Sequence, residues 1–113
     1  MILYHATDRE YAESIEATGL YPTDGGTKYV DPNLETLQGK GLYGIFGFTD
    51  IRDAKEFCNE NGYDGIIYEF EASEIIDDPE YDSNFPQYAI YGQSKFAITN
   101  EPIHARLIWE RWG

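Results

Sequence analysis

The sequence predicts an α+β fold in a single domain, residues 1–113, with mostly antiparallel sheet(s) of about six strands and two short helices. Three observations lead to this prediction. A chain of 113 residues is long enough for one hydrophobic core but not for two. Its 42% hydrophobic and 16% aromatic residues suffice for a packed interior. Strand-like segments follow one another late in the chain, which favours antiparallel pairing over a doubly wound parallel sheet.

The chain opens with a strand-like segment at residues 2–6 and a helix-like segment behind it. Thr7 and Glu10 have the spacing of a capping box, in which two side chains satisfy free N–H groups at a helix start. We therefore expect a helix from about residue 8 to residue 18. Gly19 is the residue type that commonly ends a helix.

A loop, a strand and a second helix follow. Residues 23–41 contain several glycines and a proline, and a loop of this length in a compact domain is usually functional or mobile. Residues 42–49 read as a strand, in which Gly44 and Gly47 suggest a bulge or a close backbone approach. Residues 50–61 read as a helix with an apolar face.

The clearest strand spans residues 64–72. Its Ile66, Tyr68 and Phe70 alternate with Ile67, Glu69 and Glu71, so each set lies on one face. An acidic, turn-rich segment is expected at 73–85. Further strands are expected at 88–91, 94–99 and 103–109.

Charge restricts the partners of this chain. Eight Lys and Arg stand against 21 Asp and Glu, for a net charge of −13. Such a charge repels nucleic-acid phosphates and anionic membranes and attracts basic clefts. We expect no direct nucleic-acid binding and no membrane contact, and a basic nucleic-acid-binding protein as the partner of a monomer. The chain start lacks the basic and long apolar segments of a signal peptide, so a cytoplasmic location is expected.

Metal binding finds no support in the residue pattern. A single cysteine, Cys58, excludes an intrachain disulfide and a multi-cysteine zinc site, and it is expected to be a buried small hydrophobe. The two histidines have no metal-ligand spacing. Calcium binding by residues 77–82 is a competing hypothesis, but the glycine-centred spacing of an EF-hand is missing. We therefore predict no metal site.

The negative charges are concentrated in one interval. Residues 56–94 contain no Lys or Arg. Glu69 and Glu71 share a strand face about 6.6 Å apart, whereas DNA advances ~3.4 Å per phosphate along each strand. The sequence therefore predicts a surface that mimics a polyanion, formed by Glu69, Glu71, Glu74, Asp77, Asp78, Glu80 and Asp82.

Six short segments follow one another in an order that is typical of one known family. They are LYHAT (3–7), GLYP (19–22), GIFGFTD (44–50), DAKEF (53–57), GIIYEF (65–70) and QSKFAI (93–98). Taken in this order, they resemble the ADP-ribosyltransferase-like superfamily over most of the chain. The resemblance implies that family's fold.

The resemblance also implies roles for particular residues. In active members a first-strand His or Arg holds the NAD ribose, and an aromatic residue or Ser on the second strand packs near the nicotinamide. His5 matches the first position, and either Tyr43 or Phe48-Thr49 matches the second. A Glu near the start of the late strand stabilises the oxocarbenium-like transition state. That position here reads Lys95, with Gln93 two residues before it.

The substitution at this position separates two functional hypotheses. An ammonium opposes the positive charge that develops on the ribose, and losing such electrostatic stabilisation costs on the order of 3 to 4 kcal/mol. The first hypothesis is therefore a small acidic inhibitor without a cofactor, a DNA mimic of the anti-CRISPR or anti-restriction type that phages use, on an inactive ADP-ribosyltransferase-like scaffold. A module that binds some other basic partner is not separable from it. The alternative is an NAD-dependent ADP-ribosyltransferase, or a related NAD-processing enzyme, that uses His5, Tyr43 and Gln93.

Overall fold

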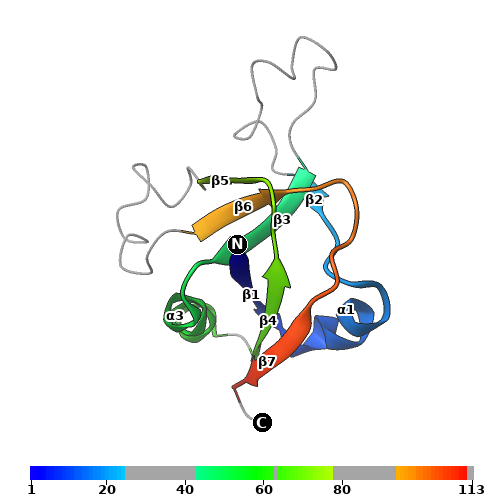
Figure 1. The fold of residues 1–113 in the computed structure, drawn as a ribbon. Helices are drawn as coiled ribbons and strands as arrows, with labels where there is room; N and C mark the ends of the chain where they lie inside the picture. Colours follow the sequence, from blue (N-terminus) through cyan, green and yellow to red (C-terminus); the bar gives the residue numbers. More distant parts are fainter. Residues whose placement is uncertain (25–42, 63, 78–93, 112–113) are drawn as a thin grey trace.

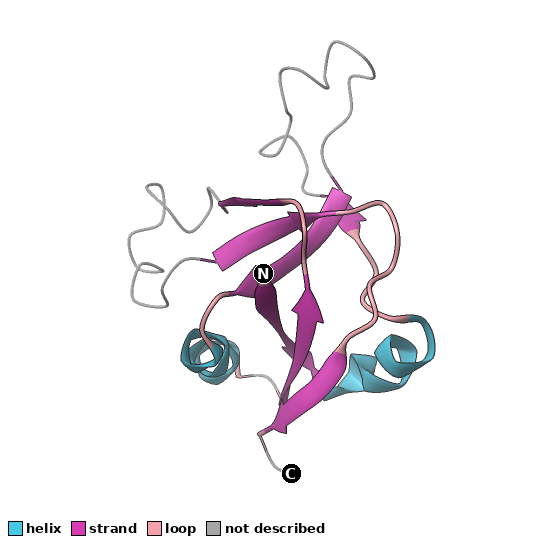
Figure 2. Cartoon of the chain, viewed as in Figure 1, coloured by secondary structure: helices cyan, strands magenta, loops and turns pink. Residues whose placement is uncertain are grey.

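The strands form one antiparallel sheet with a helix on each face (Figures 1 and 2). The computed structural model of the chain describes residues 1–24, 43–62, 64–77 and 94–111. The sheet has the order β5-β6-β3-β1-β4-β7, and a short strand β2 pairs with β3 beside this path. Every pairing between named strands in these ranges is antiparallel. This confirms the predicted α+β class, the antiparallel sheet and the two short helices.

The elements have the following bounds. The strands are β1 (Ile2–Asp8), β2 (Thr23–Asp24), β3 (Tyr43–Phe48), β4 (Gly65–Glu71), β5 (Ile75–Asp77), β6 (Ser94–Ile98) and β7 (Arg106–Glu110). The helices are the single 3-10 turn η1 (Arg9–Tyr11), α1 (Ala12–Thr18) and α3 (Ile51–Asn61). The predicted strand at 88–91 lies outside the described residues. Within the ranges that the structure describes, no helix is long and apolar enough to span a membrane.

Strand β4 is buried on both faces, as its alternating pattern predicts. Ile66, Tyr68 and Phe70 join a core that packs against α1, together with Leu3 of β1. Ile67 points the other way and joins a second core. The two apolar faces explain why this central strand needs a helix on each side.

The second core lies beneath α3. Ala54 and Cys58 of the helix are fully buried there and pack with Phe48 of β3. The helix begins after Asp50, whose carboxylate accepts a hydrogen bond from the Arg52 N–H at 2.8 Å, and it ends at Gly62. Both the helix and the burial of Cys58 were predicted from the sequence.

The sheet is nearly divided at its centre. β1 and β4 match along seven residue pairs, whereas β1 and β3 share one matched pair, Tyr4 with Phe48. Beyond that pair β3 pairs with β2 instead, through Gly44 and Tyr43. The sheet therefore consists of two halves, β5-β6-β3 and β1-β4-β7, that separate on one side of the Tyr4–Phe48 contact.

The start of the first helix differs from the prediction. Thr7 does not cap it, because β1 continues through Thr7 to Asp8, which pairs with Gly65 of β4. Asp8 caps the 3-10 turn instead, and its carboxylate accepts the Glu10 N–H at 3.0 Å. Strand pairing thus overrides the local capping pattern, and α1 begins at Ala12.

Three smaller differences also arise from pairing between distant segments. β2 lies in the predicted loop, and β5 lies in the predicted turn-rich segment. Each is short and is held by a longer neighbour, β3 or β6. The last strand is shorter than predicted, because Ile103 forms an isolated bridge with Leu20 before β7 begins.

Candidate functional site

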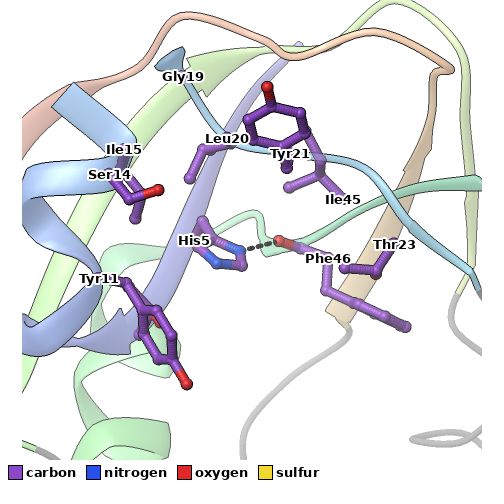
Figure 3. Close-up of a pocket in the computed structure, with 11 residues that line it drawn as sticks. His5, Tyr11, Ser14, Ile15, Gly19, Leu20, Tyr21, Thr23, Ile45 and Phe46 are labelled. Atoms are coloured by element: carbon purple, nitrogen blue, oxygen red, sulfur yellow. Dashed lines mark hydrogen bonds between the residues drawn. The ribbon is translucent and has the colours of Figure 1, made fainter. Parts of the chain in front are cut away.

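His5 lies at the point where the two halves of the sheet separate. Continuing the Tyr4–Phe48 register by one residue places His5 opposite Gly47. Instead of a further backbone pair, the imidazole Nδ1 of His5 lies 2.7 Å from the carbonyl oxygen of Phe46 (Figure 3). The side chain therefore bridges β1 and β3 where their main chains stop pairing.

This hydrogen bond determines which nitrogen of His5 carries the proton. A carbonyl oxygen can only accept, so Nδ1 is the donor, and Nε2 of the neutral ring keeps a lone pair. Burial lowers the pKa of His5 below its ordinary value of 6.5, although the bond to Phe46 opposes the shift. The ring is therefore neutral at pH 7, and Nε2 can accept a hydrogen bond from a ligand hydroxyl.

A pocket of about 240 Å³ opens beside His5. Its walls come from β1, η1, α1, the segment after α1 and β3 (Figure 3). Five lining residues carry hydroxyl groups: Thr7, Tyr11, Ser14, Tyr21 and Thr23. The apolar lining comes from Ile15, Leu20, Ile45 and Phe46.

The lining contains no Asp, Glu, Lys or Arg among the residues that the structure describes. This is unusual in a chain of which 26% is charged. The pocket is therefore a neutral, hydroxyl-rich site in an acidic protein. Such a surface suits a ligand with an apolar ring and sugar-like hydroxyl groups.

The segment after α1 is fixed in place by Gly19 and Leu20. Gly19 has a φ of 88°, which favours glycine, and a Cβ there would lie 2.8 Å from the carbonyl oxygen of Ile103. Leu20 exchanges two backbone hydrogen bonds with Ile103, at 2.8 and 3.0 Å. These contacts hold the pocket wall against the chain segment that leads into β7.

Lys95 lies on the same face of the sheet as the pocket. It pairs with Gly47 of β3, and it lies two residues from Ala97 and therefore on the same strand face, which is buried in the core on the α1 side. His5, Gly47 and Lys95 thus follow one another across three neighbouring strands. The two sequence-predicted positions, on β1 and β6, thus share a face of the sheet, but Lys95 is not among the described residues that line the pocket.

The two alternatives for the second-strand residue lie elsewhere. Tyr43 is 43% exposed, Phe48 packs in the core beneath α3, and Thr49 is exposed. None of the three is among the described residues that line the pocket, to which β3 contributes Ile45 and Phe46. Gln93 lies outside the described residues.

The hydroxyl-bearing residues were not identified from the sequence. Tyr11 and Ser14 are three residues apart, the spacing that places side chains on one face of a helix. This spacing is the one feature of the sequence that could have indicated that the two hydroxyl groups lie together. Thr23 reaches the pocket through the pairing of β2 with β3, and Tyr21 follows the Leu20–Ile103 bridge; no local pattern indicates either pairing.

The predicted acidic surface is partly neutralised within the molecule. A carboxylate oxygen of Glu69 lies 3.3 Å from the guanidinium of Arg106, and one of Glu71 lies 2.8 Å from the N-terminal ammonium. Glu74 is exposed. Asp77 ends β5, and Asp78, Glu80 and Asp82 lie outside the described residues.

In the ranges that the structure describes, no three His, Cys, Asp or Glu side chains gather as metal ligands would. The predicted calcium alternative concerned residues 77–82, most of which lie beyond those ranges. No family model, curated protein sequence or solved structure matches this chain significantly.

Proposed function

We propose that this chain is an ADP-ribosyltransferase-like domain that binds NAD through the pocket around His5 and lacks efficient transfer activity. The observation that supports it most is the position of His5. A neutral imidazole on the first strand borders a neutral, hydroxyl-rich pocket, where the family resemblance places the residue that holds the NAD ribose.

The pocket fits part of NAD better than the whole dinucleotide. Its volume of about 240 Å³ is below the roughly 300 to 1,000 Å³ of typical small-molecule sites. The apolar side chains of Ile15, Leu20 and Ile45 would contact the nicotinamide ring. Tyr11 and Tyr21 offer aromatic faces that attract a cationic pyridinium. Nε2 of His5 would accept a hydrogen bond from a ribose hydroxyl.

Lys95 is the reason to propose binding without efficient transfer. Cleavage of the bond between nicotinamide and ribose leaves positive charge on the sugar. A carboxylate at this position would stabilise that charge, and the ammonium of Lys95 opposes it. Bound NAD would therefore persist as a ligand instead of donating ADP-ribose.

The two histidines of the chain make binding straightforward to test. In a ¹H–¹³C NMR titration with NAD, we expect the imidazole signals of His5 to shift in proportion to the NAD bound. The signals of His104, which is exposed and outside the pocket lining, should stay in place. His5→Ala should weaken binding about tenfold or more, because the ribose hydroxyl that bonds to Nε2 then has no hydrogen-bond partner. His104→Ala is the matched control.

Two outcomes would contradict this proposal. Shifts of neither histidine at saturating NAD would exclude the pocket as an NAD site. Transfer of label from NAD to protein in cell extract, lost in His5→Ala, would show an active transferase and overturn the claim of inefficient transfer.

A second function, the acidic inhibitor of a basic nucleic-acid-binding protein, is favoured by the charge distribution. The net charge is −13, and residues 56–94 carry no Lys or Arg. The ion pairs of Glu69 and Glu71 are exposed, so a stronger cationic partner can displace them. A partner cleft that binds DNA could accept this surface.

This second function predicts competition with DNA. Binding to a purified restriction or CRISPR effector should be displaced by duplex DNA and weaken steeply as salt rises. Changing Glu69, Glu71 and Glu74 to Gln should reduce it, whereas changing Glu10, Glu13 and Glu16 to Gln, with the same loss of charge, should not. Salt-insensitive binding, or equal effects of the two triple variants, would count against the inhibitor.

A further inference from the structure

The second imidazole nitrogen of His5 opens into the pocket. The side chain is partly buried, and its Nδ1 is bonded to the Phe46 carbonyl. Among the described residues, every side-chain nitrogen or oxygen that is shielded from solvent has a hydrogen-bond partner. Nε2 of His5 has no such partner there, so it is not shielded, and it reaches solvent through the pocket that His5 lines (Figure 3).

A proton taken up by this ring has one place to go. Nδ1 of the neutral imidazole already carries a hydrogen, which it donates to Phe46. The added proton therefore binds Nε2, and the imidazolium carries its new N–H on the pocket side. The bond to Phe46 survives, because Nδ1 is a donor in both forms. Protonation thus changes the charge of the pocket and leaves the bridge between β1 and β3 in place.

The titratable groups that face His5 are tyrosines. Tyr68 of β4 lies directly opposite His5 in the strand register, and its hydroxyl donates to the carbonyl oxygen of Ala12 at 3.5 Å. Burial raises the pKa of Tyr68, so this hydroxyl stays neutral at and below pH 7. Tyr11 of η1 and Tyr21 after α1 are the other titratable groups of the lining as far as it is described. None of them becomes an anion that could stabilise an imidazolium.

The charged side chains on the surrounding elements lie outside the described lining. Glu10 of η1 and Glu13 and Glu16 of α1 are exposed, and Arg9 of η1 is paired with Asp64 and Glu110. Lys95 of β6 lies beyond Gly47 on the same face of the sheet, where it opposes a second cation. Burial lowers the pKa of His5 and the bond to Phe46 raises it, and neither cause is a charged side chain.

NAD brings a positive charge of its own to this pocket. Under the proposed function, on which this inference rests, the nicotinamide ring occupies the apolar lining beside His5. A pyridinium and an imidazolium would then share about 240 Å³, a volume in which two unit charges repel strongly once water is displaced. The pyrophosphate of NAD lies farther from Nε2, because the pocket is too small for the whole dinucleotide.

We propose that the His5 pocket holds one positive charge at a time, either the nicotinamide ring of NAD or a proton on Nε2 of His5, so that acidification releases NAD. By linkage, bound NAD lowers the pKa of His5 by the same factor by which protonation lowers the NAD affinity. The NAD complex binds fewer protons than the free protein. The affinity is therefore full above the His5 pKa of the free protein and is lost as the pH falls through it.

The titration of His5 measures this competition directly. In ¹H–¹³C NMR spectra of the full chain, the ring signals of His5 are followed from pH 8 toward acid, without NAD and with NAD in excess. NAD should move the His5 midpoint to lower pH by about one unit or more, which corresponds to a tenfold difference in affinity. The midpoint of His104, which is exposed and outside the described lining, should stay in place in the same samples.

A neutral ring and a neutral side chain provide the controls. NADH, whose dihydronicotinamide ring is uncharged, should move the His5 midpoint less than NAD does, or not at all. His5→Asn cannot take up a proton in this range, so its NAD affinity, although weaker, should stay constant as the pH falls. His104→Ala should retain the pH dependence of the wild type, since His104 does not contact the pocket.

The outcomes separate this proposal from the proposed function. If NAD leaves the His5 signals unchanged at pH 8, the pocket is not an NAD site and both are wrong. If NAD shifts them at pH 8 but the midpoint stays or rises, NAD binding stands and the competition is wrong. The competition is also wrong if NADH moves the midpoint as far as NAD does, if His5→Asn keeps the wild-type pH dependence, or if the folded amide spectrum is lost before His5 titrates.

Discussion

The imidazole of His5 donates its Nδ1 proton to the main-chain carbonyl of Phe46, at 2.7 Å, across the line where β1 and β3 stop pairing. One side chain thus replaces a backbone contact in the middle of the sheet. Because the bond fixes the tautomer, it also leaves Nε2 available beside the pocket. A structural role and a ligand-binding role for His5 are therefore compatible.

Replacing His5 with Ala should destabilise the fold. The change removes this donor from the partly buried Phe46 carbonyl, and the loss of such a hydrogen bond costs about 0.5–1.5 kcal/mol. Urea unfolding followed by circular dichroism measures the difference. His104→Ala, at an exposed position, should change the free energy of unfolding by less than about 0.5 kcal/mol. Equal effects of the two variants would remove the structural role assigned to His5.

The stability of the protein should decrease as the pH falls below 6.5. Burial lowers the folded-state pKa of His5, so between the two pKa values the unfolded chain binds more protons than the folded one. This contribution is fully present above pH 6.5 and is lost as the pH falls toward the folded-state pKa. Unfolding free energies of the wild type and His5→Asn, measured from pH 8 to pH 5, should converge on acidification. Parallel curves would contradict the shifted pKa.

Gly47 should resist substitution for steric reasons. A Cβ at this position would lie 2.9 Å from the Leu3 Cβ and 3.2 Å from the Phe70 ring, at the junction of the two half-sheets. Overpacking of this kind costs about 1–3 kcal/mol, and Gly47→Ala should also shift the NMR signals of His5. Gly62→Ala is the comparison, since a Cβ there has no neighbour within 4 Å and only the backbone conformation is strained. Unchanged His5 signals in Gly47→Ala would contradict the placement of Gly47 next to His5.

Under the proposed function, Lys95→Glu should introduce NAD cleavage. The new carboxylate would lie on the sheet face that contains His5, and a correctly placed electrostatic group is worth on the order of 10² in rate. Release of nicotinamide, followed by chromatography, measures the activity, which His5→Ala should abolish. Lys95→Gln removes the ammonium without adding a carboxylate and should stay near the wild-type rate. If the Glu and Gln variants cleave NAD equally, a carboxylate at position 95 does not promote NAD cleavage.

Local pattern predicted the elements whose side chains follow a clear period. The alternation of side chains along residues 65–71 predicted β4 and the residues on each of its faces. The apolar face between Asp50 and Gly62 predicted α3. Glycines predicted the close approach at Gly47. The capping pattern at Thr7 failed, because the strand pairing of β1 extends over it.

The site was only partly accessible from the sequence. The family resemblance singled out His5 and Lys95, and the strand order places them on one face of the sheet. The second-strand alternatives, Tyr43 and Phe48-Thr49, are not among the described residues that line the pocket. Their side chains are directed by the alternation and pairing of β3, and the sequence leaves that register open.

The sequence by itself determined the α+β class, the acidic charge and the segments with strong period, because these depend on residue types and short spacings. Tertiary structure decided where the sheet separates, which hydroxyl groups gather around His5, and which carboxylates are paired. Glu69 and Glu71 illustrate the difference: their shared face follows from strand alternation, whereas their partners, Arg106 and the N-terminal ammonium, lie on segments far apart in the chain. Contacts of that kind depend on how whole strands are ordered, and no local pattern encodes that order.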